Sequence, residues 1–350
     1  MMRRALILYF GLICCFSSFG QVFEGRVYDK VTMDPIQGAY IYMNGTSIYT
    51  VTDSSGVFKL SLEKILNANL VVAHMAYEQV VVINPFDDMP KVFYLEEKKI
   101  SFDEVHIVAD RYSRGTKLSV FKEQFLGQSR AGRSCRIENE EDIIIKYDDD
   151  NNLIVAFSAN PLVIHNDYLG YTIEFSLSKF EIKYRNGFSI ETNNIQQTHF
   201  EGTSAYIDLK PYDISVKRRR DEVFRSSSVY FMKQLSNRQL KATNFKILNG
   251  FKQIDIDDCF VISEEGGFKS IYILRDMTVT RQYTGEVNAP IFGVVTVLNR
   301  GSQSEIVFLT NRILVDEYGN IDKIDKVIYY GDMGKQRVGD TLPLDYNYVK

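Results

Sequence analysis

Residues 35–62, PIQGAYIYMNGTSIYTVTDSSGVFKLSL, carry the turn and strand signals that decide the fold in the first part of this chain. Asn44-Gly45 predicts a tight hairpin, because both central residues of a type I′ turn must take positive φ. Residues 53–56 are a second turn signal, and residues 57–62 then alternate between apolar and polar side chains, as a half-buried strand does. Short strands separated by turns in this way are typical of an all-β sandwich.

The flanking residues continue this pattern in both directions. Residues 22–28 alternate before the quoted stretch, and residues 70–73, 80–83 and 92–95 are further strand signals after it. Together with the strands of the quoted stretch they make about seven strands. We therefore expect a seven-stranded β-sandwich over residues 21–98.

The same residues resemble a known family, the carboxypeptidase-like regulatory domain, which has a transthyretin-like sandwich fold. The enzymes that give this family its name carry the sandwich as an appendage to a separate catalytic domain. The resemblance therefore implies an architecture and no catalytic residue. It is carried by Gly25-Arg26-Val27-Tyr28-Asp29, Pro35-Ile36-Gln37-Gly38-Ala39-Tyr40-Ile41, Gly45-Thr46 and Thr52-Asp53-Ser54-Ser55-Gly56-Val57-Phe58.

A polar linker over residues 99–117 is expected to join the sandwich to a larger β-rich domain over residues 118–350. Residues 118–127 and 220–240 place apolar side chains at helical spacing, which predicts one or two helices. Most other apolar runs in this region, such as residues 172–184, have strand character. The fold class predicted for the whole chain is therefore mainly β.

This second region resembles an uncharacterised family of exported bacterial proteins that carry the same N-terminal sandwich. No activity is assigned to that family, so the resemblance implies architecture and compartment only. It is carried by Phe125-Leu126-Gly127, Cys135-Arg136-Ile137, Pro161-Leu162-Val163-Ile164-His165-Asn166, Leu169-Gly170-Tyr171, Phe200-Glu201-Gly202-Thr203, Arg225-Ser226-Ser227, Arg337-Val338-Gly339-Asp340 and Leu342-Pro343-Leu344-Asp345-Tyr346.

Residues 1–20 have the layout of a cleaved signal peptide. Arg3 and Arg4 precede an apolar run, and small residues at the end of the segment make Gln21 the expected first residue of the mature chain. A membrane anchor would need about 20 apolar residues, which this run does not reach. A lipoprotein attached through Cys14 or Cys15 is the less favoured alternative, because the usual small residues do not precede either cysteine. We expect export to the periplasm or the outer membrane, with no transmembrane span in the mature chain.

Two cysteines remain after removal of the signal peptide, Cys135 and Cys259. In an oxidising compartment such a pair could form a disulfide. The alternative is two buried thiols that act as small apolar side chains.

Charge and histidine spacing exclude some functions. A formal net charge of -4 argues against nucleic-acid binding, which usually needs a basic surface. The four histidines, His74, His106, His165 and His199, do not form a zinc-peptidase motif, so no metal or cofactor is expected. The one basic run, residues 217–220, could bind phosphates or acidic glycans, but the two acids that follow it favour an ordinary solvated helix.

Three functional hypotheses remain open. The leading one is a non-enzymatic envelope protein whose β-rich domain binds an envelope protein or a glycan. The rival is an exported hydrolase, active on peptides or glycans, with dispersed carboxylates such as Asp340, Asp345 or those of residues 138–142. A carboxylate pair about 5 to 10 Å apart in a deep cleft would favour the rival. The third is assembly through sheet edges that add a strand from a partner.

Overall fold

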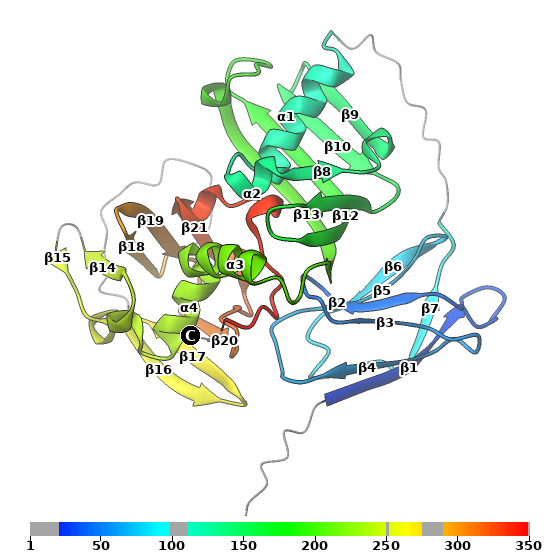
Figure 1. The fold of residues 1–350 in the computed structure, drawn as a ribbon, viewed down its shortest axis with the longest axis horizontal. Helices are drawn as coiled ribbons and strands as arrows, with labels where there is room; N and C mark the ends of the chain where they lie inside the picture. The colour runs from blue at the N-terminus through cyan, green and yellow to red at the C-terminus, as the bar shows by residue number, and fades with distance from the viewer. Residues whose placement is uncertain (1–20, 99–110, 250–251, 275–289, 349–350) are drawn as a thin grey trace, which may run out of the picture.

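The chain is mainly β, as predicted (Figure 1). Its buried apolar residues gather in three cores. We name the parts built on these cores the sandwich (residues 21–98), the middle module (residues 111–213) and the third module (residues 214–335). A C-terminal segment, residues 336–348, runs between them. The computed structural model describes residues 21–98, 111–249, 252–274 and 290–348.

The sandwich has the seven strands predicted, arranged in two facing sheets. The first sheet has the order β4-β1-β7, with β7 parallel to β1, and the second has the order β3-β2-β5-β6. Phe58, Leu60 and Leu62 alternate with exposed residues along β4 and turn into the core beside Ile41, as the sequence pattern requires. The strands are β1 (Gln21–Asp29), β2 (Tyr40–Met43), β3 (Tyr49–Val51), β4 (Val57–Leu62), β5 (Leu70–His74), β6 (Tyr77–Val82) and β7 (Val92–Leu95).

The middle module is a six-stranded antiparallel sheet with one long helix, α1, packed on the face that carries the buried core. Helix α1 packs Phe121 and Phe125 against the sheet, with ring centroids 4.5 Å from Phe180 and 5.1 Å from Phe175 respectively. Two long strands, β12 and β13, pair with each other along most of their length. The elements are α1 (Arg114–Leu126), α2 (Arg130–Arg133), β8 (Cys135–Ile137), β9 (Ile143–Asp148), β10 (Leu153–Ser158), β11 (Leu162–Asn166), β12 (Tyr171–Tyr184) and β13 (Ile195–Asp208).

The third module contains two antiparallel sheets and two helices around the second large core. The larger sheet has the order β15-β14-β18-β19-β21 and the smaller one the order β16-β17-β20. Helix α4 contributes Phe231 and Leu235, both fully buried. The elements are α3 (Ile214–Ser226), α4 (Ser228–Ser236), β14 (Phe245–Asn249), β15 (Lys252–Gln253), β16 (Phe260–Glu265), β17 (Phe268–Ile273), β18 (Gly293–Asn299), β19 (Ser302–Phe308), β20 (Arg312–Val315) and β21 (Val327–Gly331). Short 3-10 helices lie at η1 (Glu140–Asp142), η2 (Thr192–Asn194), η3 (Leu240–Ala242), η4 (Ile256–Asp258), η5 (Ile324–Lys326), η6 (Met333–Lys335) and η7 (Val338–Asp340).

The helices differ from the prediction in number and in bounds. The described residues hold four α-helices rather than one or two. Helix α1 begins inside the expected linker, because the Ser113 hydroxyl caps it by accepting from the Thr116 N–H at 3.1 Å. The predicted helix 220–240 is two helices, interrupted where Ser227 caps α4 by accepting from the Tyr230 N–H. Residues 99–110 of the expected linker lie outside the described part of the chain.

The prediction of a tight two-residue turn at Asn44-Gly45 is wrong, although β2 and β3 do pair as a hairpin. Positive φ is found at Gly45 (φ +77°) but not at Asn44, and residues 44–48 all lie between β2 and β3. The turn is wider because it is docked on strand β13 of the middle module. Its Gly45 N–H donates to the Ser204 carbonyl at 2.7 Å, and the Thr46 carbonyl accepts from the Tyr206 N–H at 2.9 Å.

The C-terminal segment contacts all three parts of the molecule. Val338 lies in the core of the middle module, and Tyr346 packs against the core of the third module. The Leu344 N–H donates to the Gly45 carbonyl at 2.8 Å, and the Asp345 carboxylate accepts from the Ser47 N–H at 2.9 Å and from the Ser47 hydroxyl at 2.6 Å. These bonds and those of β13 hold the sandwich to the middle module and to the C-terminal segment, and the Asn67 amide donates to the Leu314 and Asn320 carbonyls of the third module. The sandwich is therefore a docked part of one assembly.

Candidate binding site

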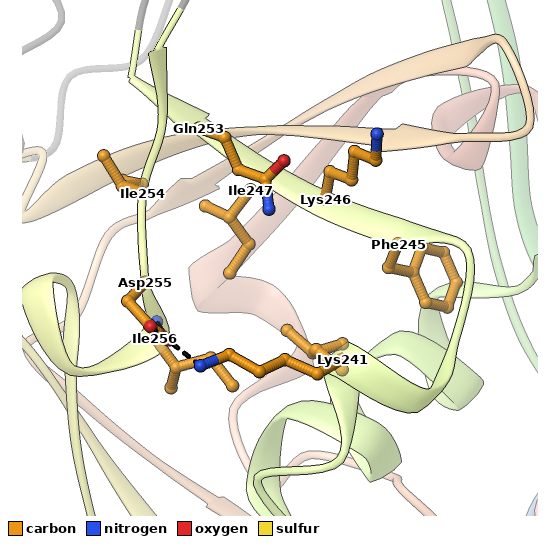
Figure 2. A pocket seen from close by; sticks show the side chains of 9 residues that line it. Lys241, Phe245, Lys246, Ile247, Gln253, Ile254, Asp255 and Ile256 are labelled. Carbon is orange, nitrogen blue, oxygen red and sulfur yellow. Dashed lines mark hydrogen bonds and ion pairs between the residues drawn. The ribbon is translucent and has the colours of Figure 1, made fainter.

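A pocket of about 250 Å³ opens in the third module, between η3, β14, β15 and η4 (Figure 2). Its floor is apolar and belongs to the module core, whereas its rim is polar and exposed. The floor residues are Leu240, Phe245, Ile247 and Ile256, with half-buried Ile254 at the side. The rim residues are Lys241, Lys246, Gln253 and Asp255.

Local hydrogen bonds shape this pocket. The Ile254 N–H donates to the Ile247 carbonyl at 3.1 Å, which holds the chain after β15 against β14. Asp255 then starts η4 through a reciprocal cap. Its carboxylate accepts from the Ile256 N–H at 2.9 Å, and the Asp258 carboxylate accepts from the Asp255 N–H at 3.1 Å. Both walls of the pocket therefore have a defined backbone.

One ion pair lies on the rim. The Lys241 side chain extends along the edge of the pocket, and its Nζ lies 2.9 Å from Oδ2 of Asp255 (Figure 2). The hydrogen bond from Lys241 holds the pKa of the Asp255 carboxyl below its usual range, and that carboxylate in turn raises the pKa of Lys241. Both side chains are more than half exposed, so solvent screens the pair and it contributes little to stability. An incoming polar group can therefore displace it at small cost.

The composition of the lining limits what the pocket can do. None of the nine lining residues is a nucleophilic Ser, Cys or Thr, and none is a His. The cavity is below the roughly 300 to 1,000 Å³ of pockets that take drug-sized ligands. Its size and apolar floor suit one large side chain of a partner, which would gain about 1.5 to 3 kcal/mol on burial. Such anchor pockets carry much of the affinity of protein interfaces.

These pocket residues were not singled out by the sequence analysis. A signal does exist in the alternation of Phe245 and Ile247 and of Ile254 and Ile256 with charged or polar neighbours. That alternation predicts two strands with a common buried face, but it does not show that a cavity remains between them.

The structure does not bring Cys135 and Cys259 together. Both are free thiols, Cys135 packed against the core of the middle module and Cys259 fully buried in the core of the third. Burial raises the pKa of Cys135 to about 12 and that of Cys259 to about 11. In this structure both thiols are therefore protonated side chains packed among apolar residues.

Most of the carboxylates considered for hydrolysis have a structural partner, whereas Glu141 is exposed. Asp340 accepts from the Ser129 hydroxyl and from the Arg337 N–H, which joins α2 to the C-terminal segment. Asp345 accepts from Ser47, as described above. Glu140 forms an ion pair with Lys122 at 2.9 Å, on the outside of helix α1.

Glu138 is the carboxylate with the most suggestive surroundings. Its Oε2 lies 2.7 Å from Nε2 of His165, whose Nδ1 lies 3.0 Å from Oγ1 of Thr172. This order of carboxylate, imidazole and hydroxyl is that of a hydrolytic triad. Thr172, however, is only 8% exposed and sits within strand β12, paired across the sheet with His165. No pocket described here includes any of the three residues.

The other histidines are dispersed. His199 pairs with Glu201 on β13, the His74 Nδ1 accepts from the Ala76 N–H, and His106 lies outside the described residues. Within the described ranges no group of three His, Cys, Asp or Glu side chains is placed to hold a metal ion.

The basic run of residues 217–220 is divided among different partners. Lys217 pairs with Asp221 one turn later on α3, and Arg220 is buried against Asp208. Arg219 donates from Nε to the Tyr168 carbonyl at 2.6 Å. The run is thus not a uniform solvated face, because each of these three side chains has a different environment.

Comparison with known proteins identifies only the first module. No curated protein matches the chain. Among the helices of the described residues, none is long and apolar enough to cross a membrane. The sandwich, with its two sheets in the orders β4-β1-β7 and β3-β2-β5-β6, is the part for which a family is found. Residues 23–107 match the family model of the CarboxypepD_reg-like domain, which confirms the resemblance carried by the motifs between Gly25 and Phe58.

Proposed function

We propose that this protein is a non-enzymatic, exported envelope protein that binds a partner protein through the pocket of its third module. The observation that carries the proposal is the apolar floor of that pocket, formed by Leu240, Phe245, Ile247 and Ile256 and open to solvent between polar rim residues. A floor of this kind gains free energy by covering an apolar side chain and offers no group for bond cleavage.

The sandwich supports this role as a docked part of a larger binding platform. Its β2–β3 turn is hydrogen-bonded to β13 and to the C-terminal segment, which limits its movement relative to the pocket-bearing module. A partner that contacts the sandwich and the pocket together would meet a surface that is already ordered, so less entropy is lost on binding.

The test compares capture of envelope proteins by the mature chain and by pocket variants. Ile254→Trp places an indole ring beside the cavity and fills it. Lys241→Glu places a second carboxylate next to Asp255 on the rim. Ile324→Trp is the matched control, because Ile324 is 77% exposed on η5 and does not line the pocket. Quantitative mass spectrometry of the captured proteins is the readout.

We expect one partner to be captured by the mature chain and by the Ile324→Trp variant, and to fall about tenfold or more with Ile254→Trp. Capture that is equal for all four proteins would show that the pocket does not hold the partner. Circular dichroism of each variant confirms that the fold is kept.

A hydrolase is the second candidate, favoured by the Glu138, His165 and Thr172 arrangement alone. A screen of peptide and glycan substrates with the mature chain and with the Thr172→Val variant tests it. Turnover that disappears in Thr172→Val would replace the binding proposal by the hydrolase. Turnover that is unchanged in the variant would exclude this triad.

A further inference from the structure

Two arginines from different modules stack on one tyrosine ring. The Cζ atom of Arg130, on α2, lies 5.0 Å from the centroid of the Tyr168 ring, and that of Arg219, on α3, lies 5.1 Å from it. Tyr168 itself lies in the turn between β11 and β12 and is half-buried. Helices α2 and α3 lie near each other where the middle and third modules meet (Figure 1).

The guanidinium groups keep hydrogen-bond donors that the chain does not use. Arg219 donates from Nε to the Tyr168 carbonyl, and its Nη1 has only a long contact of 3.5 Å to the Ser215 hydroxyl. Arg130 is exposed and held by the stacking contact. Within the described part of the chain, neither arginine forms an ion pair, and the exposed Asp167 beside Tyr168 does not pair with them.

Arg220, the next residue on α3, also lies over a tyrosine ring, but it is paired with a carboxylate. Its Cζ lies 3.8 Å from the centroid of the Tyr171 ring, and its two Nη atoms bind the Asp208 carboxylate at 2.8 and 2.7 Å. Arg220 is 4% exposed and has its anion within the protein. Arg130 and Arg219 also lie over a tyrosine ring, at 5.0 and 5.1 Å, but neither is paired with a carboxylate in the described part of the chain.

Three carboxylates near these helices are engaged with other groups, whereas Asp167, next to Tyr168 in the chain, is exposed and forms no ion pair among the described residues. Asp208 binds Arg220, and Asp340 accepts from Ser129 and from the Arg337 N–H. Asp221 accepts from Lys217 and from the Tyr346 hydroxyl. Two positive groups therefore lie beside one ring, no more than about 10 Å apart by the two ring distances, and neither forms an ion pair with a described residue.

The contact with the Tyr168 ring holds both guanidinium groups beside one side chain. Guanidinium donors that are not used within the protein match the oxygens of a phosphate in pairs. We propose that Arg130, Tyr168 and Arg219 form a binding site for a phosphate-bearing ligand, either a soluble phosphate ester or a lipid headgroup. This site is distinct from the pocket of the third module and does not depend on the partner proposed for it.

The test uses isothermal titration of the mature chain with pyrophosphate, and flotation with phosphatidylcholine vesicles that contain or lack phosphatidic acid. The variants are Arg130→Gln, Arg219→Gln and the double Arg130→Lys/Arg219→Lys, which keeps the charge but loses the planar stacking. Arg133→Gln and Arg218→Gln are matched controls, since each removes an exposed arginine from α2 or α3 that does not stack on Tyr168.

We expect each Gln variant to bind pyrophosphate or the acidic vesicles about tenfold to a hundredfold more weakly, and both controls to bind as the unaltered chain does. The Lys variant should bind more weakly than the unaltered chain although its charge is the same, and it remains informative if Arg219→Gln fails to fold. Binding to vesicles alone identifies a lipid headgroup, whereas binding to pyrophosphate identifies a soluble phosphate ester. Equal losses in the controls, full binding by the Lys variant, or no binding by the unaltered chain to either probe would overturn the proposal.

Discussion

Replacing Arg220 by Met is expected to destabilise the junction of the middle and third modules by about 3 kcal/mol. Arg220 is buried on α3 and makes four hydrogen bonds to the turn and strands beside it. Two go to Asp208, and two go to the carbonyls of Leu169 and Gly170 at 2.7 and 3.2 Å. The substitution keeps an apolar contact with the Tyr171 ring but loses the cation–π interaction and leaves the acceptors without a donor.

The magnitude follows from the burial of both partners. Breaking a buried ion pair from one side costs about 3 to 5 kcal/mol, because the remaining charge loses both its partner and its water. The Asp208 side chain is 29% exposed, so water compensates part of this loss and the lower end applies. Three kcal/mol is about a hundredfold in the folding equilibrium.

Urea denaturation followed by circular dichroism measures this change. Arg218→Met is the control, since Arg218 is exposed on the same helix and its loss is expected to change stability by less than about 0.5 kcal/mol. The double variant Arg220→Met/Asp208→Leu should recover part of the loss, because it removes the unpaired acid as well. A destabilisation by Arg220→Met no larger than that of Arg218→Met would show that the pair does not hold this junction.

Three further predictions concern the two cysteine thiols, the β2–β3 turn and the signal peptide. Burial raises the pKa values of Cys135 and Cys259 to about 12 and 11, so the folded chain keeps protons that the unfolded chain loses above about pH 9. Stability should therefore fall as the pH rises from 9 towards 11, and less steeply in a Cys135→Ala/Cys259→Ala variant in urea titrations; an equal slope would contradict this. Asp345→Ala should lower the free energy of unfolding by about 1 to 3 kcal/mol, because the Ser47 N–H loses its acceptor. Faster tryptic cleavage between the sandwich and the middle module is the readout. Intact-mass measurement of the secreted chain should give Gln21 as its first residue, whereas a mass that includes residues 1–20 would exclude the predicted cleavage.

Several parts of the structure could be predicted from the sequence because they depend on neighbouring residues. The alternation of Phe58, Leu60 and Leu62 determines which face of β4 is buried whatever the rest of the chain does. The same holds for most strands of the sandwich. The interruption at Ser227 also had a local sign, since serine is a favoured helix cap. The start of α1 at Arg114 had one as well in Ser113, although Gly115 and the polar residues around it have the composition of a linker.

Tertiary structure decided what depends on residues far apart in the chain. Asn44-Gly45 has the sequence of a tight hairpin, but docking on Ser204 and Tyr206 of β13 opens the turn. Residues 118–350 were expected to form one domain, but their buried residues separate into two large cores, which only long-range packing can determine.

The pocket of the third module and the proposed phosphate site also depend on residues that are far apart in the sequence. The arginines of residues 217–220 are evident in the sequence, yet Asp208 neutralises Arg220, whereas no acid among residues 21–98, 111–249, 252–274 and 290–348 pairs with Arg219. Composition cannot distinguish Arg219 from Arg220, because the acid that pairs with an arginine lies on another element of the fold. By itself the sequence determined the β character of the chain and the sandwich family. The fold alone decided which residues lie together, since a binding site depends on distances in space.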